Sequence, residues 1–226
     1  MLTLHHLEYS QSFRILWLLE ELGSPYELKC YNRDPESNLA PDDYKALSPL
    51  GTAPVVTDGD VVLAESNAII DYVLDSHPDS PLAPAAGHKD RARHLFWFHS
   101  SSGSLMPLQS IEMVLGLLET RAPWPISALL RSVFGQVRKL FTNPRFTALL
   151  DLMESDLGKQ DYFGGDQLTA ADITLVYSMY ALRDKGAFEG GYPNINAWFD
   201  RIEALESFKS ARTKDDRDRI TFRFEN

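Results

Sequence analysis

The chain has 226 residues, of which 44% are apolar and 24% are charged, a composition typical of a globular protein with a sizeable core. Its formal net charge of −10 disfavours binding to nucleic acids and to anionic membranes, because both attract positive charge. A single cysteine, Cys30, excludes an internal disulfide framework and a cysteine-rich zinc site. The sequence shows no secretory leader and no apolar run near the roughly 20 residues of a membrane span, so we expect a cytoplasmic protein.

The first third of the chain alternates between strand and helix patterns. Residues 2–7 and 26–30 alternate apolar and polar side chains as strands do, and a helix pattern from residue 10 lies between them, ended by Gly23. The pattern continues with a short helix over 41–48, strands over 54–57 and 61–63, and a helix over 65–74. The order is therefore β-α-β-α-β-β-α.

A composition shift follows this segment, with three prolines between residues 78 and 84, and indicates a linker over 78–88. We expect one domain at 1–77 and an all-helical domain at 89–226. Its helices are predicted over 126–141, 145–158, 170–184 and 194–206, after a long helical region at 89–119. Thr169 can cap its helix while Asp172 reaches back to the cap, and the charged run 214–219 reads as a solvated tail or helix end.

Two short motifs in the first domain suggest a binding site. Pro54 directly precedes an apolar strand, where an X-Pro bond can be cis and would turn the backbone N–H and C=O of Ala53 outward to pair with an extended peptide. Glu65 and Ser66 open the following helix, whose free N–H groups and partial positive charge suit a carboxylate. The plainer alternative is a turn, a buried strand and a capped helix without a ligand.

Taken together, the motifs at 9–14, 52–56, 65–69 and 168–172 stand in the order and spacing of a known family. Over nearly its whole length the chain resembles the cytosolic glutathione S-transferases, and residues 104–107 and 192–198 resemble most the bacterial and fungal, Gtt-like serine-type members. The resemblance implies a thioredoxin-like first domain, an all-helical second domain, and glutathione as co-substrate. It also implies a transferase, used for example in detoxification, that acts as a homodimer.

The resemblance further implies where glutathione lies. Its cysteinyl backbone would pair with Ala53, beside Thr52 and before a cis Pro54. Its γ-glutamyl carboxylate would meet Ser66 and the helix start, and Glu65 would take its ammonium group. These are the groups that the residues alone had placed at a peptide site.

Glutathione transferases attack with a thiolate, and a thiol with a pKa of about 8.5 is only a few per cent ionised near neutral pH. A hydroxyl donor at a helix N-terminus stabilises the anion. Ser10 is our first candidate for that donor, because residues 10–14 resemble the serine-type active-site turn. Ser12 could donate instead, with Ser10 as the cap, and Tyr9 could contribute its phenol; both serines could also serve only as caps. The strand pattern favours an inert, buried Cys30.

The helical domain would supply the electrophile pocket, for which we select Leu105, Met106, Ile111 and Met113, although all four could be core residues. We expect no metal site. Reduction of peroxides with glutathione at the same site is the nearest alternative activity. A different class is a binding module that kept the fold without its chemistry, since a fold alone does not establish activity.

Overall fold

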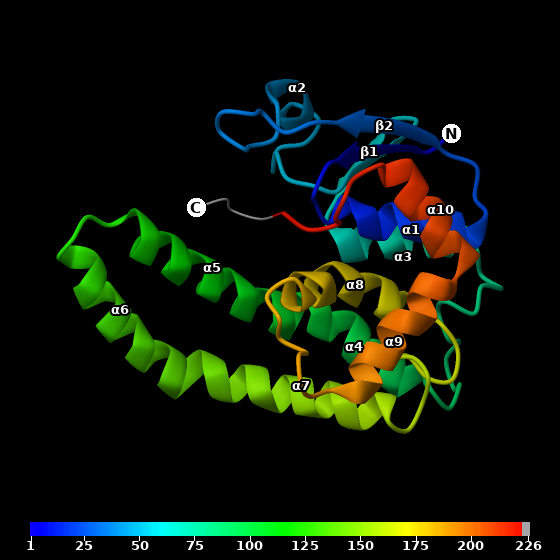
Figure 1. Cartoon of the computed structure of the whole chain (residues 1–226). Coiled ribbons are helices and arrows are strands. Elements are labelled where there is room, and N and C mark those ends of the chain that lie inside the picture. The colour runs from blue at the N-terminus through cyan, green and yellow to red at the C-terminus, as the bar shows by residue number, and fades with distance from the viewer. Residues whose placement is uncertain (223–226) are drawn as a thin grey trace.

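The computed structural model describes residues 1–222 and begins with a mixed β-sheet covered by helices (Figure 1). The strand order is β2-β1-β3-β4; β1 and β2 are parallel, whereas β3 is antiparallel to both β1 and β4. The predicted β-α-β-α-β-β-α order of this thioredoxin-like part is confirmed. Its elements are β1 (Thr3–Leu7), α1 (Ser12–Leu22), β2 (Glu27–Tyr31), α2 (Asp42–Lys45), β3 (Val55–Asp58), β4 (Val61–Ala64) and α3 (Ser66–Asp75).

Helix α1 forms the centre of this part because it is apolar over almost its whole circumference. The stretch from Ile15 to Leu19 is at most 1% exposed, and Phe13 and Trp17 meet the ring of Phe208 edge-on. Gly23 ends the helix in the left-handed conformation, at φ +60, which a side chain would strain. A helix buried on all sides needs partners on every face, and α1 contacts β1, α3 and two helices of the second domain.

The second part of the chain is helical, as predicted. Helix α4 continues through a π-helical segment into α5, and α6 continues through a second such segment into α7. Figure 1 shows α5 and α6 as an arm that projects away from the sheet. The elements are α4 (Arg91–Ser100), η1 (Ser101–Leu105), α5 (Met106–Arg121), α6 (Ile126–Val137), η2 (Arg138–Thr142), α7 (Asn143–Leu157), α8 (Ala170–Arg183), α9 (Pro193–Ala204) and α10 (Glu206–Asp215).

The capping box at the start of α8 is confirmed. The Thr169 side chain accepts the backbone N–H of Ala171, and Asp172 Oδ2 accepts the N–H of Thr169 at 3.0 Å. The other oxygen of Asp172 accepts the Phe163 N–H at 2.8 Å and the Trp198 Nε1–H at 3.0 Å. One buried carboxylate therefore joins α8 to the loop before it and to α9.

Helix α10 is the main difference from the sequence-based expectation. The charged run at 214–219 was expected to be solvated, but α10 extends to Asp215, which is buried, and packs along α1 (Figure 1). The physical reason is that Phe208 and Ala211 of α10 are buried with the apolar side chains of α1, so the helix is held against the first domain. The predicted second domain ran to residue 226, and residues 223–226 lie outside the described part of the chain.

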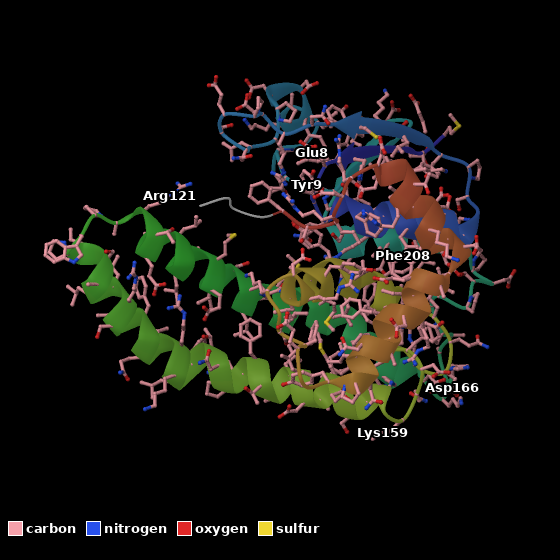
Figure 2. All side chains as sticks on the ribbon, viewed as in Figure 1. Glu8, Tyr9, Arg121, Lys159, Asp166 and Phe208 are labelled. Atoms are coloured by element: carbon pink, nitrogen blue, oxygen red, sulfur yellow. The ribbon has the colours of Figure 1, made fainter. Side chains whose placement is uncertain are left out.

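The helical arm carries many large apolar side chains in contact with solvent. Trp124 is 83% exposed, and Arg121, labelled in Figure 2, marks the tip of the arm. Within residues 1–222, no helix is long and apolar enough to cross a membrane. The other exposed apolar residues of the arm are Met113, Val114, Leu118, Ile126, Leu129, Val133 and Val137, and Leu140, Phe141 and Leu152 follow on η2 and α7.

Candidate functional site

The candidate site begins with the turn between β1 and α1, where the two serines contact each other. Ser10 Oγ lies 2.8 Å from Ser12 Oγ and donates to the Leu7 carbonyl at 2.7 Å. The backbone N–H of Ser12 donates back to Ser10 Oγ at 3.2 Å. Ser10 is 5% exposed and Ser12 is fully buried. Of the two residues, only Ser10 has any contact with solvent.

Behind Ser12 lies a histidine that the sequence did not single out for the site. Ser12 Oγ is 2.8 Å from Nδ1 of His6, and Nε2 of His6 is 2.8 Å from Oδ1 of Asp215. His6 and Asp215 are both buried, and Arg212 Nη1 lies 2.6 Å from the second oxygen of Asp215. The alternation along β1 placed His6 and His5 on opposite faces, but nothing in the sequence indicated that α10 would return to β1 from 209 residues away.

Tyr9 is turned away from the serines, toward the C-terminal segment. Its hydroxyl donates to Asp218 Oδ1 at 3.1 Å, and the Arg219 guanidinium lies over its ring. Partial burial and the hydrogen bond to the Asp218 carboxylate raise the pKa of Tyr9 above its ordinary value. Figure 2 labels Tyr9 beside Glu8, whose carboxylate pairs with Arg217 of the same segment. The phenol of Tyr9 is therefore less acidic than in solution.

The loop before β3 presents a short stretch of backbone outside the sheet. The Ala53–Pro54 peptide bond is cis, Thr52 is exposed and Ala53 is half-buried. Within residues 1–222, Ala53 forms no main-chain hydrogen bond of the turn or loop type. Ala53 stands two residues before Val55, where β3 starts, and β3 itself is paired on both sides, with β1 and β4. An extended peptide would therefore pair with the loop before β3, not with a free strand edge.

The start of α3 combines a strained residue with a buried hydroxyl. Glu65 has a φ of +74, a region that residues other than glycine rarely adopt, and its side chain is exposed. Ser66 is 5% exposed, and its Oγ lies 3.4 Å from Gln11 Oε1. Gln11 stands between Ser10 and Ser12 in the turn, so the two predicted halves of the site meet through one amide side chain.

A buried arginine, also overlooked in the sequence, completes this contact. Nη1 of Arg14 donates to Gln11 Oε1 at 2.8 Å and lies 3.5 Å from Ser66 Oγ, while Nη2 donates to Ser178 Oγ at 3.2 Å. Arg14 is fully buried, and its Nε lacks a hydrogen-bond partner within the described chain. Burial lowers the pKa of Arg14 to about 10. Among residues 1–222, no carboxylate pairs with this guanidinium.

The four side chains chosen for the electrophile pocket do not gather at one place. Leu105 is fully buried in the main core, and Ile111 is half-buried. Met113 is 41% exposed on α5. Met106 lies closest to the other candidate residues, with its sulfur 3.6 Å from both terminal nitrogens of Arg14.

The prediction that Cys30 is buried is wrong. Its thiol lies on β2, an edge strand, and the residue is exposed. Partial desolvation nevertheless raises the pKa of Cys30 above its ordinary value. The alternation of β2 gave the correct strand, but it could not show that the edge position leaves this residue uncovered. An accessible thiol with a raised pKa is not an activated nucleophile.

Comparisons with known proteins identify the family to which these features belong. Residues 10–76 match the model of the glutathione S-transferase N-terminal domain, and residues 136–206 match that of the C-terminal domain. Glutathione S-transferase 3 of Schizosaccharomyces pombe is 31% identical over 214 residues, which cover 95% of this chain and 88% of the relative. Glutathione S-transferase 1 of Saccharomyces cerevisiae is 30% identical over 225 residues and 95% of each chain.

Solved structures agree with this assignment. A glutathione S-transferase from Actinobacillus pleuropneumoniae superposes with a TM-score of 0.74 at 31% identity, over 96% of this chain and 93% of that structure. A glutathione S-transferase from Xylella fastidiosa gives a TM-score of 0.75 at 20% identity, over 95% and 98% of the two chains. The second similarity, at low identity, shows the shared fold only.

Proposed function

Because this chain belongs to the glutathione S-transferase family, we propose that it activates the thiol of glutathione for attack on a hydrophobic electrophile. One observation carries the proposal beyond the family. The turn that holds Ser10 and the helix start that holds Ser66 form one hydrogen-bonded cluster through Gln11 and Arg14. A ligand with a thiol at one end and a carboxylate at the other would meet a hydroxyl at each.

In this proposal, glutathione lies between the loop before β3 and the start of α3. Its cysteinyl backbone pairs with Ala53, next to Thr52 and before Pro54. Its γ-glutamyl carboxylate accepts hydrogen bonds from Ser66 and from the free N–H groups of α3, and Glu65 takes the ammonium group. The support for this placement is the backbone of the loop before β3, where Ala53 makes no hydrogen bond of the turn or loop type within residues 1–222, and the buried Ser66.

Arg14 adds a charge that the sequence-based placement lacked. A buried guanidinium without a carboxylate is costly, and a carboxylate bound at Ser66 would be close enough to offset that cost. We therefore propose that Arg14 is the counter-charge for the γ-glutamyl carboxylate. The ligand would supply the partner that the described chain does not.

Ser10 is the proposed thiolate donor. Lowering the pKa of a thiol by two units requires roughly 2.7 kcal/mol of differential stabilisation, which one charge-assisted hydrogen bond and a helix N-terminus can together provide. Ser10 lies just before α1 and keeps some contact with solvent, whereas Ser12 is fully covered. These two facts favour Ser10 over Ser12 as the group that meets sulfur.

For the electrophile we propose a position beside Met106, whose sulfur reaches Arg14 at the boundary between the sheet part and the helical part. A flexible thioether suits a pocket that accepts apolar groups of several shapes. We keep the proposed division into a glutathione-binding domain at 1–77, a linker at 78–88 and a helical domain from 89.

We also propose a homodimer. Phe96 on α4 is 49% exposed and Val62 on β4 is 50% exposed, in addition to the apolar side chains of the arm. Apolar surface of this kind is commonly covered by another subunit. Sedimentation at micromolar concentration is expected to give the mass of two chains, and Phe96→Glu is expected to give one. A wild-type protein that sediments only as a monomer would contradict the dimer.

The activity is tested by calorimetric titration with glutathione and with S-methylglutathione, together with the ultraviolet absorbance of the bound thiolate. We expect saturable binding of both peptides and thiolate absorbance with glutathione alone. Rates with an aryl halide and with a hydroperoxide then separate a transferase from a glutathione peroxidase, since the same thiolate would attack either. Absence of binding at millimolar glutathione would instead indicate a module without this chemistry.

A further inference from the structure

A row of buried polar side chains leads from Ser10 into the protein and ends at the last residue of α10. The neighbouring atoms are Ser10 Oγ, Ser12 Oγ, Nδ1 and Nε2 of His6, and Oδ1 of Asp215, and each hydrogen-bonded step along the row is 2.8 Å. All four residues are at most 5% exposed. They come from β1, the turn before α1, the first residue of α1, and α10, so the row exists only when α10 is packed against the first domain.

The hydrogen atoms in this row can be assigned from its inner end. The carboxylate oxygens of Asp215 act as acceptors: Oδ2 accepts a hydrogen bond from Arg212 Nη1, and Oδ1 lies 2.8 Å from Nε2 of His6. The hydrogen between Asp215 and His6 therefore belongs to Nε2 of the imidazole. In neutral His6 the other nitrogen, Nδ1, then carries a lone pair directed at Ser12.

At the outer end of the row, the hydroxyls of Ser12 and Ser10 can direct their hydrogens toward that lone pair of His6. The Leu7 N–H donates to Ser12 Oγ at 3.1 Å. The hydroxyl hydrogen of Ser12 then has two acceptors in reach, Nδ1 of His6 at 2.8 Å and the Leu7 carbonyl at 3.1 Å, and the contact with His6 is the shorter. Ser10 Oγ accepts the Ser12 N–H, and its own hydrogen reaches the Leu7 carbonyl at 2.7 Å or, after rotation about the Cβ–Oγ bond, Ser12 Oγ at 2.8 Å. One lone pair of Ser10 then remains for an incoming donor.

We propose that this row takes up the thiol proton of bound glutathione and holds it on His6; the proposal rests on the proposed function and names Ser10 as the contact with sulfur. The S–H bond breaks, its electron pair stays on sulfur, and the proton forms a new O–H bond on Ser10. The former hydrogen of Ser10 moves to Ser12, and that of Ser12 moves to Nδ1 of His6.

The products are a thiolate and an imidazolium, and both serines are again neutral hydroxyls. The new hydrogen of Ser10 points at sulfur, so the same step that removes the proton also leaves a donor to the thiolate. The imidazolium is paired with Asp215 inside the protein, which is the condition under which a buried charge is tolerated. His6 and Asp215 do not touch the substrate, and they act as positioning residues through the serines.

The surroundings of His6 support this role. The groups that face it are Ser12 on α1, Asp215 with Arg212 on α10, and Cys30 at the paired position of β2. His5, the adjacent residue, points to the other face of the sheet, where its ring nitrogens contact Tyr31 and Thr57. His5 is equally buried, so it offers a matched control on the same strand.

The test counts protons and thiolates separately at pH 7. Calorimetry of glutathione binding in buffers of different ionisation enthalpy gives the protons released to solvent, ultraviolet absorbance gives the thiolate formed, and S-methylglutathione gives the background. For the wild type we expect the thiolate to form while almost no proton is released to the solvent, because the proton stays on His6. His5→Asn should give the same ratio.

His6→Asn removes the acceptor, and we expect the thiolate fraction at equal occupancy to fall about tenfold or more. Asp215→Asn should lower it in the same direction, because the imidazolium loses its counter-charge. If His6→Asn does not fold, Ser12→Ala cuts the same row, keeps both charged ends and should give the same loss.

Two results would overturn the proposal: release of a full proton per thiolate by the wild type, or an unchanged thiolate fraction in a folded variant that breaks the row. Failure of the proposed function is a distinct result. In that case the wild type would bind no glutathione, or would bind it without forming any thiolate. The ratio of released protons to thiolate could then not be defined.

Discussion

Replacing Arg14 by methionine separates the stability of the empty protein from its affinity for glutathione. Burial lowers the pKa of Arg14 to about 10. At about 1.4 kcal/mol per tenfold change in proton affinity, burying the charged guanidinium destabilises the unliganded fold by roughly 3 kcal/mol. Methionine has a similar length and would pack beside Met106 without a charge. We expect the unliganded Arg14→Met protein to be as stable as the wild type, or more stable.

Glutathione binding should respond in the opposite direction. If the γ-glutamyl carboxylate recovers half or more of the cost of the buried charge, its loss weakens binding by about 10- to 100-fold. Calorimetric titration measures the affinity, and urea denaturation without ligand measures the free energy of unfolding. Arg14→Lys, which keeps the charge and loses the planar fork, should lie between the two proteins.

An analogue of glutathione with the γ-glutamyl carboxylate converted to an amide makes the test specific. The wild type should bind it at least about tenfold more weakly than glutathione, whereas Arg14→Met should bind the two almost equally. Arg93→Met is the matched control, since Arg93 donates to the backbone carbonyls of Phe163 and Asp156 within the helical part. It should lose stability and keep its glutathione affinity. Full affinity in Arg14→Met would refute the reasoning.

The other predictions concern the thiol, the capping box and acid stability. Ser10→Ala should lower the conjugation rate by about 100-fold or more at saturating glutathione, as loss of one preorganised donor does; an unchanged rate would rule out Ser10 as the donor. Asp172→Ala leaves the N–H groups of three partners unpaired in the interior, so urea denaturation should show a loss of roughly 3 to 5 kcal/mol, and a loss below about 1 kcal/mol would contradict this. Burial lowers the pKa of His94 to about 4, so the folded state favours the neutral imidazole. The free energy of unfolding should therefore keep its full value above pH 6.5 and decrease by about 3 kcal/mol as the pH falls from 6.5 through 4. His94→Phe, which keeps the stacking on Phe98, should remove that part of the pH dependence, and an equally steep acid loss in the variant would assign it to other groups.

The local patterns of the sequence were sufficient for the order of the elements in the sheet part and for most of the later helices, although not for α10. Alternation gave β1 and β2, the stop at Gly23 gave the end of α1, and the spacing of Thr169 and Asp172 gave the capping box, because each of these depends on residues close in the chain. The same kind of reasoning selected Ala53 and Ser66, which sit at element ends, whereas Ser10 was selected from the resemblance to the serine-type turn; the roles of all three stay predictions.

The sequence could not locate groups that depend on distant contacts. Arg14 is buried through contacts with Ser66 of α3 and Ser178 of α8, which are 52 and 164 residues away in the sequence. Asp215 belongs to a charged run that was expected to be a solvated tail or helix end, and it is buried because α10 returns to β1. Pairings across 209 residues leave no local periodicity to detect. For the same reason, four apolar residues of one helical stretch were grouped as a pocket, although the turn of the helix directs Leu105 into the core and Met113 into solvent.

The contact between α10 and β1 also determines the order in which the site is assembled during synthesis. The serine turn and the sheet leave the ribosome long before α10, whose Asp215 faces His6 across 209 residues of sequence. A nascent chain that already contains the sheet and every helix up to α9 therefore still lacks the inner end of the buried polar row. The row is completed only when α10 has been made and has packed against α1.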